Sequence, residues 1–143
     1  MKILFPITNT VDAQALLYAE EVAISQGAKL VVLYITSPLT FSSCYAYPSL
    51  LYSVANLNME SIETAHQAIR HNIKSLLTGS NYEIMCLIGP QLDTIINVAN
   101  DNGIDCIVAT HEHKIYDKLK HKSQRAKLSS DISIMLYEGR KRA

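Results

Sequence analysis

Residues 30–36 have the sequence LVVLYIT, an unbroken run of apolar, aromatic and β-branched residues. A strand with one face in water alternates apolar and polar side chains, whereas this run has no polar face. It therefore predicts a strand of a parallel sheet that is covered by helices on both sides. Parallel strands need long crossover connections, so the flanking sequence has to supply those helices.

The segment before this run has the pattern that such a sheet requires. KILFPI, residues 2–7, is a short apolar run that ends in a polar turn, and it predicts a first buried strand. Asp12 can then cap a helix, with apolar residues at helical spacing until Gly27 ends it. One strand, one helix and a second strand follow each other in the first 36 residues.

A long connection follows the run. Residues 37–56, SPLTFSSCYAYPSLLYSVAN, contain two prolines and have no regular pattern. Three tyrosines in it could form a lid over a cleft, contact a partner or pack on the sheet edge: Tyr45, Tyr47 and Tyr52. From residue 57 to 77, one apolar stripe predicts the second helix, with these residues facing inward: Ile62, Ala65, Ile69, Ile73 and Leu76.

The rest of the chain continues the alternation. Further strands are predicted at residues 82–88, 104–110 and 132–137. Gly89-Pro90 opens a helix that Gly103 ends, and residues 116–130 predict at most a weakly amphipathic helix. The alternation predicts an α/β fold: a doubly wound, five-stranded parallel sheet with helices on both faces, in a single domain spanning residues 1–143.

Composition excludes some classes of protein. Hydrophobic residues make up 48% of the chain, and no apolar stretch approaches the roughly 18 residues of a membrane helix. The N-terminal run lacks the pattern of a signal peptide, so we expect a cytoplasmic protein that does not contact membranes. The three cysteines lack metal-ligand spacing and are predicted to be reduced thiols: Cys44, Cys86 and Cys106.

Charge is distributed unevenly along the chain. Residues 1–109 hold 4 basic and 9 acidic side chains, whereas residues 110–143 hold 9 basic and 4 acidic ones. Much of the basic excess lies in ATHEHKIYDKLKHKSQRAK, residues 109–127, which follows a predicted buried strand. Such a position in an open α/β sheet commonly binds ligands, but this stretch has no glycine to let a phosphate approach the backbone.

Three segments together resemble the universal stress protein family: KILFPI, ALLYAEEVAISQGAKLVVLYI and IGPQLDTIINVANDNGIDCIVAT. The resemblance extends from the N-terminus to Thr110 and weakens afterwards. It implies a Rossmann-like, adenine nucleotide alpha hydrolase-like fold, a homodimer paired through the last strand, and no catalytic reaction. Some members of this family bind ATP or AMP, and others have lost the nucleotide motif.

The family's nucleotide motif is a Gly, two residues, a second Gly, nine residues, and a third Gly followed by Ser or Thr. On this sequence the three glycines fall on Thr110, His113 and Ser123, so all are absent. If the second glycine takes a positive φ, a histidine there is hindered by its Cβ. The acidic residue that ends the first strand in the family falls on Thr8.

Two other positions fit the nucleoside side of the family's pattern: Pro6 after the first strand, and Ile35 as an apolar wall at the end of the second. His111 is a further candidate ligand-binding residue beside Thr110. The resemblance therefore implies a cleft in the family's position that has lost the standard means of holding ATP. No cofactor is predicted, although ATP or AMP stays open.

Lysines attract phosphate without glycine, so Lys120, Lys122 and the other cations of residues 110–127 could hold a nucleotide or another anion by charge. Nucleic acid is a weaker interpretation, because few aromatic residues lie among the charges. A metal shared by His111 and His113 lacks a fixed third ligand, and none is predicted. No serine, histidine and acid arrangement is identifiable, so we do not expect an enzyme.

The last predicted strand would be an exposed apolar edge in a monomer. Pairing with a second copy would cover that edge, so we predict a homodimer interface at these residues: Ile134, Met135, Leu136 and Tyr137. The sequence thus predicts a non-catalytic, regulatory binding or interaction protein of the stress-response type, with an unidentified protein partner. The alternative is a nucleotide- or anion-binding regulator that uses lysine and histidine side chains.

Overall fold

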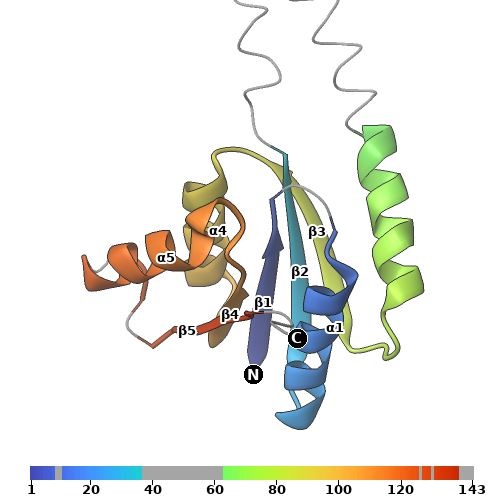
Figure 1. Ribbon diagram of the computed structural model, residues 1–143, viewed down its shortest axis with the longest axis horizontal. Coiled ribbons are helices and arrows are strands. Elements are labelled where there is room, and N and C mark those ends of the chain that lie inside the picture. Colours follow the sequence, from blue (N-terminus) through green and yellow to red (C-terminus); the bar gives the residue numbers. More distant parts are fainter. Residues whose placement is uncertain (9–10, 37–62, 126, 130, 139–143) are drawn as a thin grey trace, which may run out of the picture.

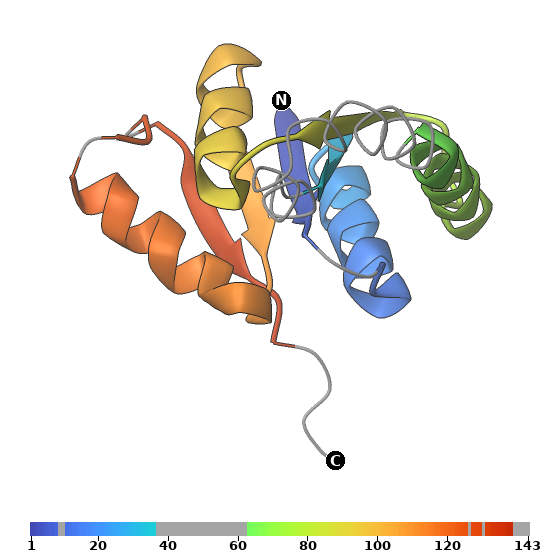
Figure 2. The ribbon, with the colours of Figure 1, turned by 90° about the horizontal axis from the view of Figure 1, so that it is seen from above.

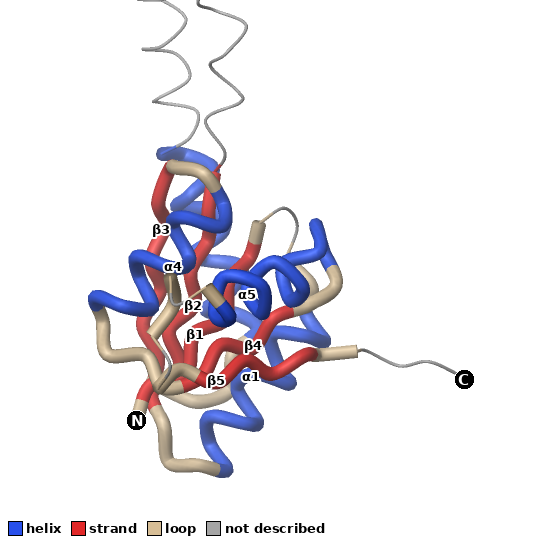
Figure 3. Tube along the Cα trace, turned by 90° about the vertical axis from the view of Figure 1, so that its left-hand side faces the viewer, coloured by secondary structure: helices blue, strands red, loops and turns tan. Residues whose placement is uncertain are grey.

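A computed structural model describes residues 1–8, 11–36, 63–125, 127–129 and 131–138. Its centre is a five-stranded, all-parallel sheet in the order β3-β2-β1-β4-β5 (Figure 3). The strands are β1 (Lys2–Ile7), β2 (Lys29–Thr36), β3 (Tyr82–Ile88), β4 (Cys106–Ala109) and β5 (Ser133–Leu136). The predicted fold class is confirmed, and each strand lies close to its predicted range.

Helices cover both faces of this sheet. The helical elements are α1 (Ala13–Ser25), a helix at residues 63–76, α4 (Gln91–Asp101), the short 3-10 helix η2 (Glu112–Lys114) and α5 (Ile115–Gln124). Figure 1 shows α1 and the helix at 63–76, drawn in green, on one side of the strands, and α4 and α5 on the other. None of the helices within the described ranges is long and apolar enough to cross a membrane.

The central strand β1 contributes to the core on both faces. Ile3 and Phe5 pack in a cluster with α1 and the helix at 63–76, whereas Leu4, between them, packs with α4 and α5. All three side chains are at most 2% exposed. Burying each contributes about 1.5–3 kcal/mol, which explains why the sequence around this strand has no polar face. The run at residues 30–36 also contributes side chains to the core on both faces of the sheet, as predicted.

Local signals set the ends of two helices. The Asp12 carboxylate accepts hydrogen bonds from the backbone N–H groups of Gln14 and Ala15 at the start of α1. Gly27 follows α1 with φ +63°, and Gly103 follows α4 with φ +65°. Both lie in the left-handed region that glycine adopts without steric cost, so the predicted helix stops are confirmed.

The structure differs from the predictions in the second and last helices. Only residues 63–76 of the helix predicted at 57–77 are described, and Ala65 is exposed, so its predicted place in the core is wrong. The connection at 37–56, with its three tyrosines, lies outside the described residues. The stretch at 109–127, compared above with a phosphate loop, is mostly helical, because Ile115, Leu119 and Leu128 are buried against the sheet.

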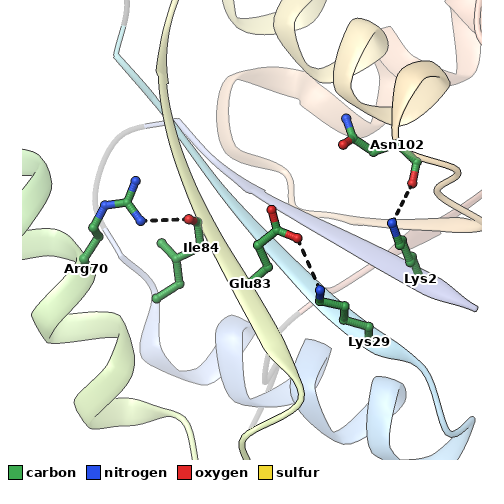
Figure 4. A network of polar contacts seen from close by, with 6 residues as sticks. All are labelled: Lys2, Lys29, Arg70, Glu83, Ile84 and Asn102. Atoms are coloured by element: carbon green, nitrogen blue, oxygen red, sulfur yellow. Dashed lines mark hydrogen bonds and ion pairs between the residues drawn. The ribbon is translucent and has the colours of Figure 1, made fainter.

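The two edge strands of the sheet, β3 and β5, differ in their side-chain contacts. At the β3 edge, Arg70 of the helix at 63–76 donates a hydrogen bond of 2.8 Å to the carbonyl of Ile84 (Figure 4). Glu83 on the same strand forms an ion pair with Lys29 at 3.4 Å. At the β5 edge, no such side-chain bond is made to the backbone among the residues that the structure describes. The β3 edge is therefore partly blocked against pairing with another strand.

A buried carboxylate fastens α1 to the turn before β3. Glu20 is 6% exposed and accepts hydrogen bonds from the Thr78 N–H, the Thr78 hydroxyl and the Gly79 N–H, at 2.9–3.1 Å. Burial by itself would raise the pKa of Glu20, but these hydrogen bonds outweigh it, and the pKa is lowered. The charged form of Glu20 therefore stabilises the fold.

Replacing this carboxylate tests its contribution. Glu20→Gln keeps the size of the side chain but removes the charge, so we expect a loss of about 1–3 kcal/mol in the free energy of unfolding at neutral pH. Because the folded pKa is lowered, the contribution exists above the unfolded pKa and is lost as pH falls through the folded pKa. The difference between the two proteins, measured by urea denaturation, should shrink as the pH is lowered below about 5.

Glu21→Gln is the matched control, because Glu21 is the exposed neighbour on the same helix. We expect it to change the free energy of unfolding by less than about 0.5 kcal/mol. Equal losses in the two variants at neutral pH would contradict the assigned role of Glu20.

Candidate functional site

A pocket of about 450 Å³ opens at the carboxyl ends of β1 and β4. These two parallel strands are neighbours in the sheet, and the order in which strands are added reverses between them. From β1 the chain continues to β2 on one side, and after β3 it crosses to β4 on the other side of β1. The loops that leave such a pair diverge to opposite faces, and the crevice between them is the usual ligand site of an open α/β sheet. We therefore take this pocket as the candidate site.

The wall of the pocket comes from four parts of the chain: the end of β1, the start of α1, the turn after β4, and the residues after β5. Its lining residues are Phe5, Pro6, Ile7, Asp12, Thr110, His111, Glu112, Tyr137 and Glu138. Three of the predicted site residues are brought together in it: Pro6, Thr110 and His111. Whether they bind a ligand stays a prediction.

Two hydrogen bonds lie at this pocket, and one of them joins two strand ends. The Thr8 hydroxyl donates to the Glu112 carboxylate at 3.0 Å, which links the end of β1 to the turn after β4. The Thr110 hydroxyl accepts a bond of 3.2 Å from the Glu112 N–H. Thr8, which stands where the family has an acidic residue, thus holds a carboxylate that comes from a different segment of the chain.

The pocket is acidic. Three carboxylates line it, from Asp12, Glu112 and Glu138, and His111 is exposed at its rim. Its lining residues include no lysine or arginine among the residues that the structure describes. The Asp12 carboxylate is directed to the first turn of α1 by the two backbone bonds that it accepts.

The other predicted site residues lie elsewhere. Ile35 is 1% exposed in the core between the sheet and α4, so it does not line the pocket. Lys120, Lys122 and Ser123 are on α5 and do not line it either. Lys120 lies over the Tyr116 ring, 5.9 Å from its centroid, and Lys122 lines a separate groove beside α4.

The backbone after β4 also differs from the expectation for His113. The residue in the left-handed region is Lys114, with φ +56° and ψ +33°, and it is the only non-glycine residue with positive φ in the described part of the chain. His113 lies within η2 instead. The position at which glycine would relieve the backbone is therefore Lys114, because the 3-10 turn continues through His113 before the chain turns into α5.

Sequence inspection missed part of the pocket. The sequence predicts Tyr137 only as an interface residue and Asp12 only as a helix cap, and it assigns no site role to Glu112 or Glu138. Asp12 directly precedes α1, and the other three lie within three residues after the end of β4 or β5, at the carboxyl edge of the sheet, which is a usable signal. Among the described residues no group of three or more His, Cys, Asp and Glu side chains could hold a metal ion.

A second polar cluster lies beside the end of β2. The His66 ring nitrogen Nε2 is 2.8 Å from the Thr36 hydroxyl, and the His66 ring meets the Tyr34 ring edge-on at 5.7 Å. Burial and the nearby Arg70 lower the pKa of His66, although Glu63 opposes this. His66 is half-buried. Its bond to Thr36 attaches the helix at 63–76 to the sheet.

The universal stress protein family model matches residues 1–119 of the chain. The chain belongs to the universal stress protein family. The resemblance seen in the three sequence segments is confirmed, and it extends over the turn after β4 and half of α5. No curated protein is significantly similar to this chain in sequence.

Several solved universal stress proteins share the fold. UspA from Lactobacillus plantarum is 17% identical with a TM-score of 0.64, covering 96% of this chain and 97% of that one. The protein from Archaeoglobus fulgidus in complex with dAMP is 15% identical with a TM-score of 0.54, covering 96% and 98%. A universal stress protein in complex with cAMP is 13% identical with a TM-score of 0.55, covering 96% and 95%. At these identities, the likeness shows the fold alone.

The left-handed residue before α5 gives a test of the local backbone. Lys114→Gly should raise the free energy of unfolding by about 0.5–1 kcal/mol, because glycine adopts positive φ without the steric cost of a Cβ. Lys118→Gly, in the exposed interior of α5, should lower it by about 1 kcal/mol. Thermal and urea denaturation measure both values. A loss of stability in Lys114→Gly would contradict the left-handed geometry.

Proposed function

We propose that this universal stress protein works by binding and interaction, without catalysis, and that it has lost the standard binding of ATP. The observation that carries the proposal is the charge of the pocket at the carboxyl edge of the sheet. Asp12, Glu112 and Glu138 line it, and none of its described lining residues is a lysine or an arginine. A triphosphate bound there would lie against carboxylates, whereas its binding requires cations or backbone N–H groups that are free to donate.

The backbone of the turn after β4 supports the same proposal. The Glu112 N–H donates to the Thr110 hydroxyl at 3.2 Å, and the Lys114 N–H donates to the carbonyl of His111 at 3.0 Å. Two amides of this turn are thus engaged within the protein. Thr110 and His113 also stand at positions where the family's binding members are expected, from the resemblance, to have glycine and close access to the backbone.

The alternative is that a nucleotide or another anion is held by lysine and histidine side chains of residues 110–127. Two relatives in the structural comparison were solved with cAMP and dAMP, which keeps a nucleotide within consideration. Against it, Lys120 and Lys122 lie on α5 and do not line the pocket. The acidic pocket therefore favours the first proposal.

Calorimetric titration of the purified protein with ATP, AMP and cAMP tests the loss of standard binding. We expect no saturable binding at micromolar concentrations of any of the three, because the carboxylates repel the phosphate groups. Micromolar ATP binding that persists at moderate salt would contradict the proposal. Salt-sensitive binding that disappears when Lys120 and Lys122 are replaced by alanine would instead support the alternative.

The absence of catalysis is part of the same proposal. Two described lining residues carry hydroxyls, Thr110 and Tyr137. The Thr110 hydroxyl accepts a hydrogen bond from the Glu112 N–H, and no serine or cysteine is among the described lining residues. We also propose a cytoplasmic location. It is supported by Cys86 and Cys106, which are free thiols in the structure, as expected in a reducing compartment.

We propose further that the protein is a homodimer paired through β5. The support is the difference between the sheet edges: Arg70 bonds to the backbone of β3, whereas β5 carries half-buried apolar side chains at an edge that the described residues leave open. Two of the four predicted interface residues also have a role within the chain. The Tyr18 hydroxyl donates to the Met135 sulfur at 3.4 Å, and the Tyr18 and Tyr137 rings are 5.1 Å apart.

Leu136 is therefore the cleaner position for a test of the dimer than Met135. Leu136→Lys should convert a dimer to a monomer, because it places a charge in an apolar strand pair. Ile88→Lys is the matched control, since Ile88 is 41% exposed on the opposite edge strand, and it should leave the dimer intact. Light scattering after gel filtration measures both masses. A Leu136→Lys protein that stays dimeric would refute the interface.

A further inference from the structure

The edge strand β3 is protected along only part of its length. At Ile84 the backbone carbonyl accepts the hydrogen bond from Arg70, which covers the edge there (Figure 4). Further along the strand, none of the described side chains bonds to the backbone of Cys86 or Ile88. Ile88 is also 41% exposed. Native proteins usually protect an edge strand against pairing, so residues 86–88, here called the open edge segment, are a candidate interaction surface.

The backbone of the open edge segment points away from the sheet. The Gly89 N–H donates to the carbonyl of Thr36 on β2, whereas the Ile84 carbonyl is bonded from outside the sheet. Successive residues of a strand direct their N–H and C=O groups to alternate sides, so the odd-numbered residues of β3 face β2 and the even-numbered ones face outward. Cys86 and Ile88 therefore each present an N–H and a C=O group at the edge.

A groove of about 420 Å³ runs beside the open edge segment, between β3 and the helix at 63–76. Figure 2 shows this helix, in green, at the end of the molecule opposite to α5. Cys86, Leu87 and Ile88 form one wall of the groove, and side chains of the helix form the other. The outward backbone groups of β3 thus lie next to a space that a further segment of chain can enter.

The two ends of this groove carry opposite charges. Arg70 lies at one end, level with the carbonyl that it bonds, and its guanidinium has further N–H donors. Towards the other end, His66 bonds to Thr36, which is the register partner of Ile88 on β2. Glu63 lines the groove one turn before His66 on the same helix. The helix therefore runs antiparallel to β3, with its cation beside residue 84 and its carboxylate towards residue 88.

An extended peptide matches both the backbone and the charges of the groove. A strand presents N–H and C=O groups at the spacing of a sheet edge, so it can pair with Cys86 and Ile88. A small anion would use Arg70 but leave these backbone groups unpaired. Nucleic acid needs several cations, and Arg70 is the only lysine or arginine among the described lining residues.

We infer that the open edge segment of β3 is the docking site for an extended segment of a partner protein, which pairs antiparallel to β3 and has a basic residue four positions before an acidic one. The inference rests on the proposed binding and interaction function and gives the conformation and charges of the partner.

The pairing brings the partner's charges to the correct face of the sheet. With the acidic residue opposite Ile84 and the basic residue opposite Ile88, both side chains project to the face that Ile84 shares with the helix at 63–76. There they meet Arg70 and Glu63, respectively. The groove and the pocket at the carboxyl edge have no lining residue in common, so the two sites are separate.

Backbone methylation tests the strand pairing. The probe is the labelled peptide acetyl-Lys-Val-Thr-Val-Asp-amide, with its affinity for the full-length protein measured by fluorescence anisotropy. In antiparallel pairing its threonine N–H faces Cys86, and the N–H of the next valine faces away. N-methylation of the threonine should weaken binding about tenfold, and N-methylation of that valine should change it less than about twofold. Equal effects, or no binding of the probe, would overturn the inference.

Exchange of the two charged residues tests the direction of the peptide. The peptide with lysine and aspartate exchanged has the same composition and should bind about tenfold more weakly, because each charge then meets a like charge. Arg70→Gln should reduce this preference, and Arg70→Lys should retain most of it. Lys74→Gln is the matched control, since Lys74 is exposed one turn further along the same helix, and it should leave the preference unchanged. Equal binding of the two peptides to the unmodified protein would overturn the inference.

Two variants of Ile88 test the edge itself. Ile88→Pro removes an outward N–H without breaking the ladder to β2, so it should weaken binding of the probe about tenfold while the protein stays folded. Ile88→Val keeps the N–H and should bind as the unmodified protein does. Equal binding by the two variants would overturn the inference.

Light scattering of the same variants excludes a second copy as the occupant. A lower mass for Ile88→Pro than for Ile88→Val would show that two copies pair through β3, and it would overturn the inference. Nucleotide titration and the mass of the Leu136→Lys protein do not depend on β3. A failure of this docking site is therefore distinguishable from a failure of the proposed function.

Discussion

Burial of the central strands on both faces is the constraint on which the rest of this structure depends. β1 and β2 have almost no polar side chains, so two layers of helices must cover them. Parallel strands can be covered on both sides only if the chain winds first in one direction from β1 and then in the other. The crevice between β1 and β4 is the geometric result, and the candidate pocket lies there.

The side chains at that crevice are the basis of the proposed loss of standard ATP binding. A phosphate site at such a position needs free backbone amides and a positive potential. In the described part of the crevice, the Glu112 N–H bonds to the Thr110 hydroxyl, and Glu112 brings a carboxylate that Thr8 holds in place at 3.0 Å. These contacts support the proposal.

The two edges of the sheet present different surfaces. Arg70 closes part of the β3 edge by its bond to Ile84, and the ion pair of Lys29 and Glu83 lies beside it. The opposite edge, at β5, has no comparable side-chain bond among the described residues, and α5 next to it carries exposed basic side chains. The same buried contacts that hold α5 on the sheet, from Ile115 and Leu119, point its charged side outward.

The sequence by itself determined the order of the elements, the parallel sheet and the family, because apolar runs, helix caps and glycine stops act through neighbours in the chain. Asp12, Gly27 and Gly103 do in the structure what their local patterns predict. For the same reason, Pro6, Thr110 and His111 could be predicted at one sheet edge. The helical state of residues 115–124 could not, since Ile115 and Leu128 gain their apolar contacts only from the sheet and α4.

Only the tertiary structure decided which side chains share the pocket. The bond between Thr8 and Glu112 joins residues 104 positions apart, and Tyr137 and Glu138 reach the same wall from beyond β5. Conversely, Ile35 went to the core and Lys120 to the far side of a helix, although both had been assigned to the site. Coulomb interactions depend on the distance between charges in space. The order of residues along the chain does not give these distances, so the charge of the pocket could be read only from the tertiary structure.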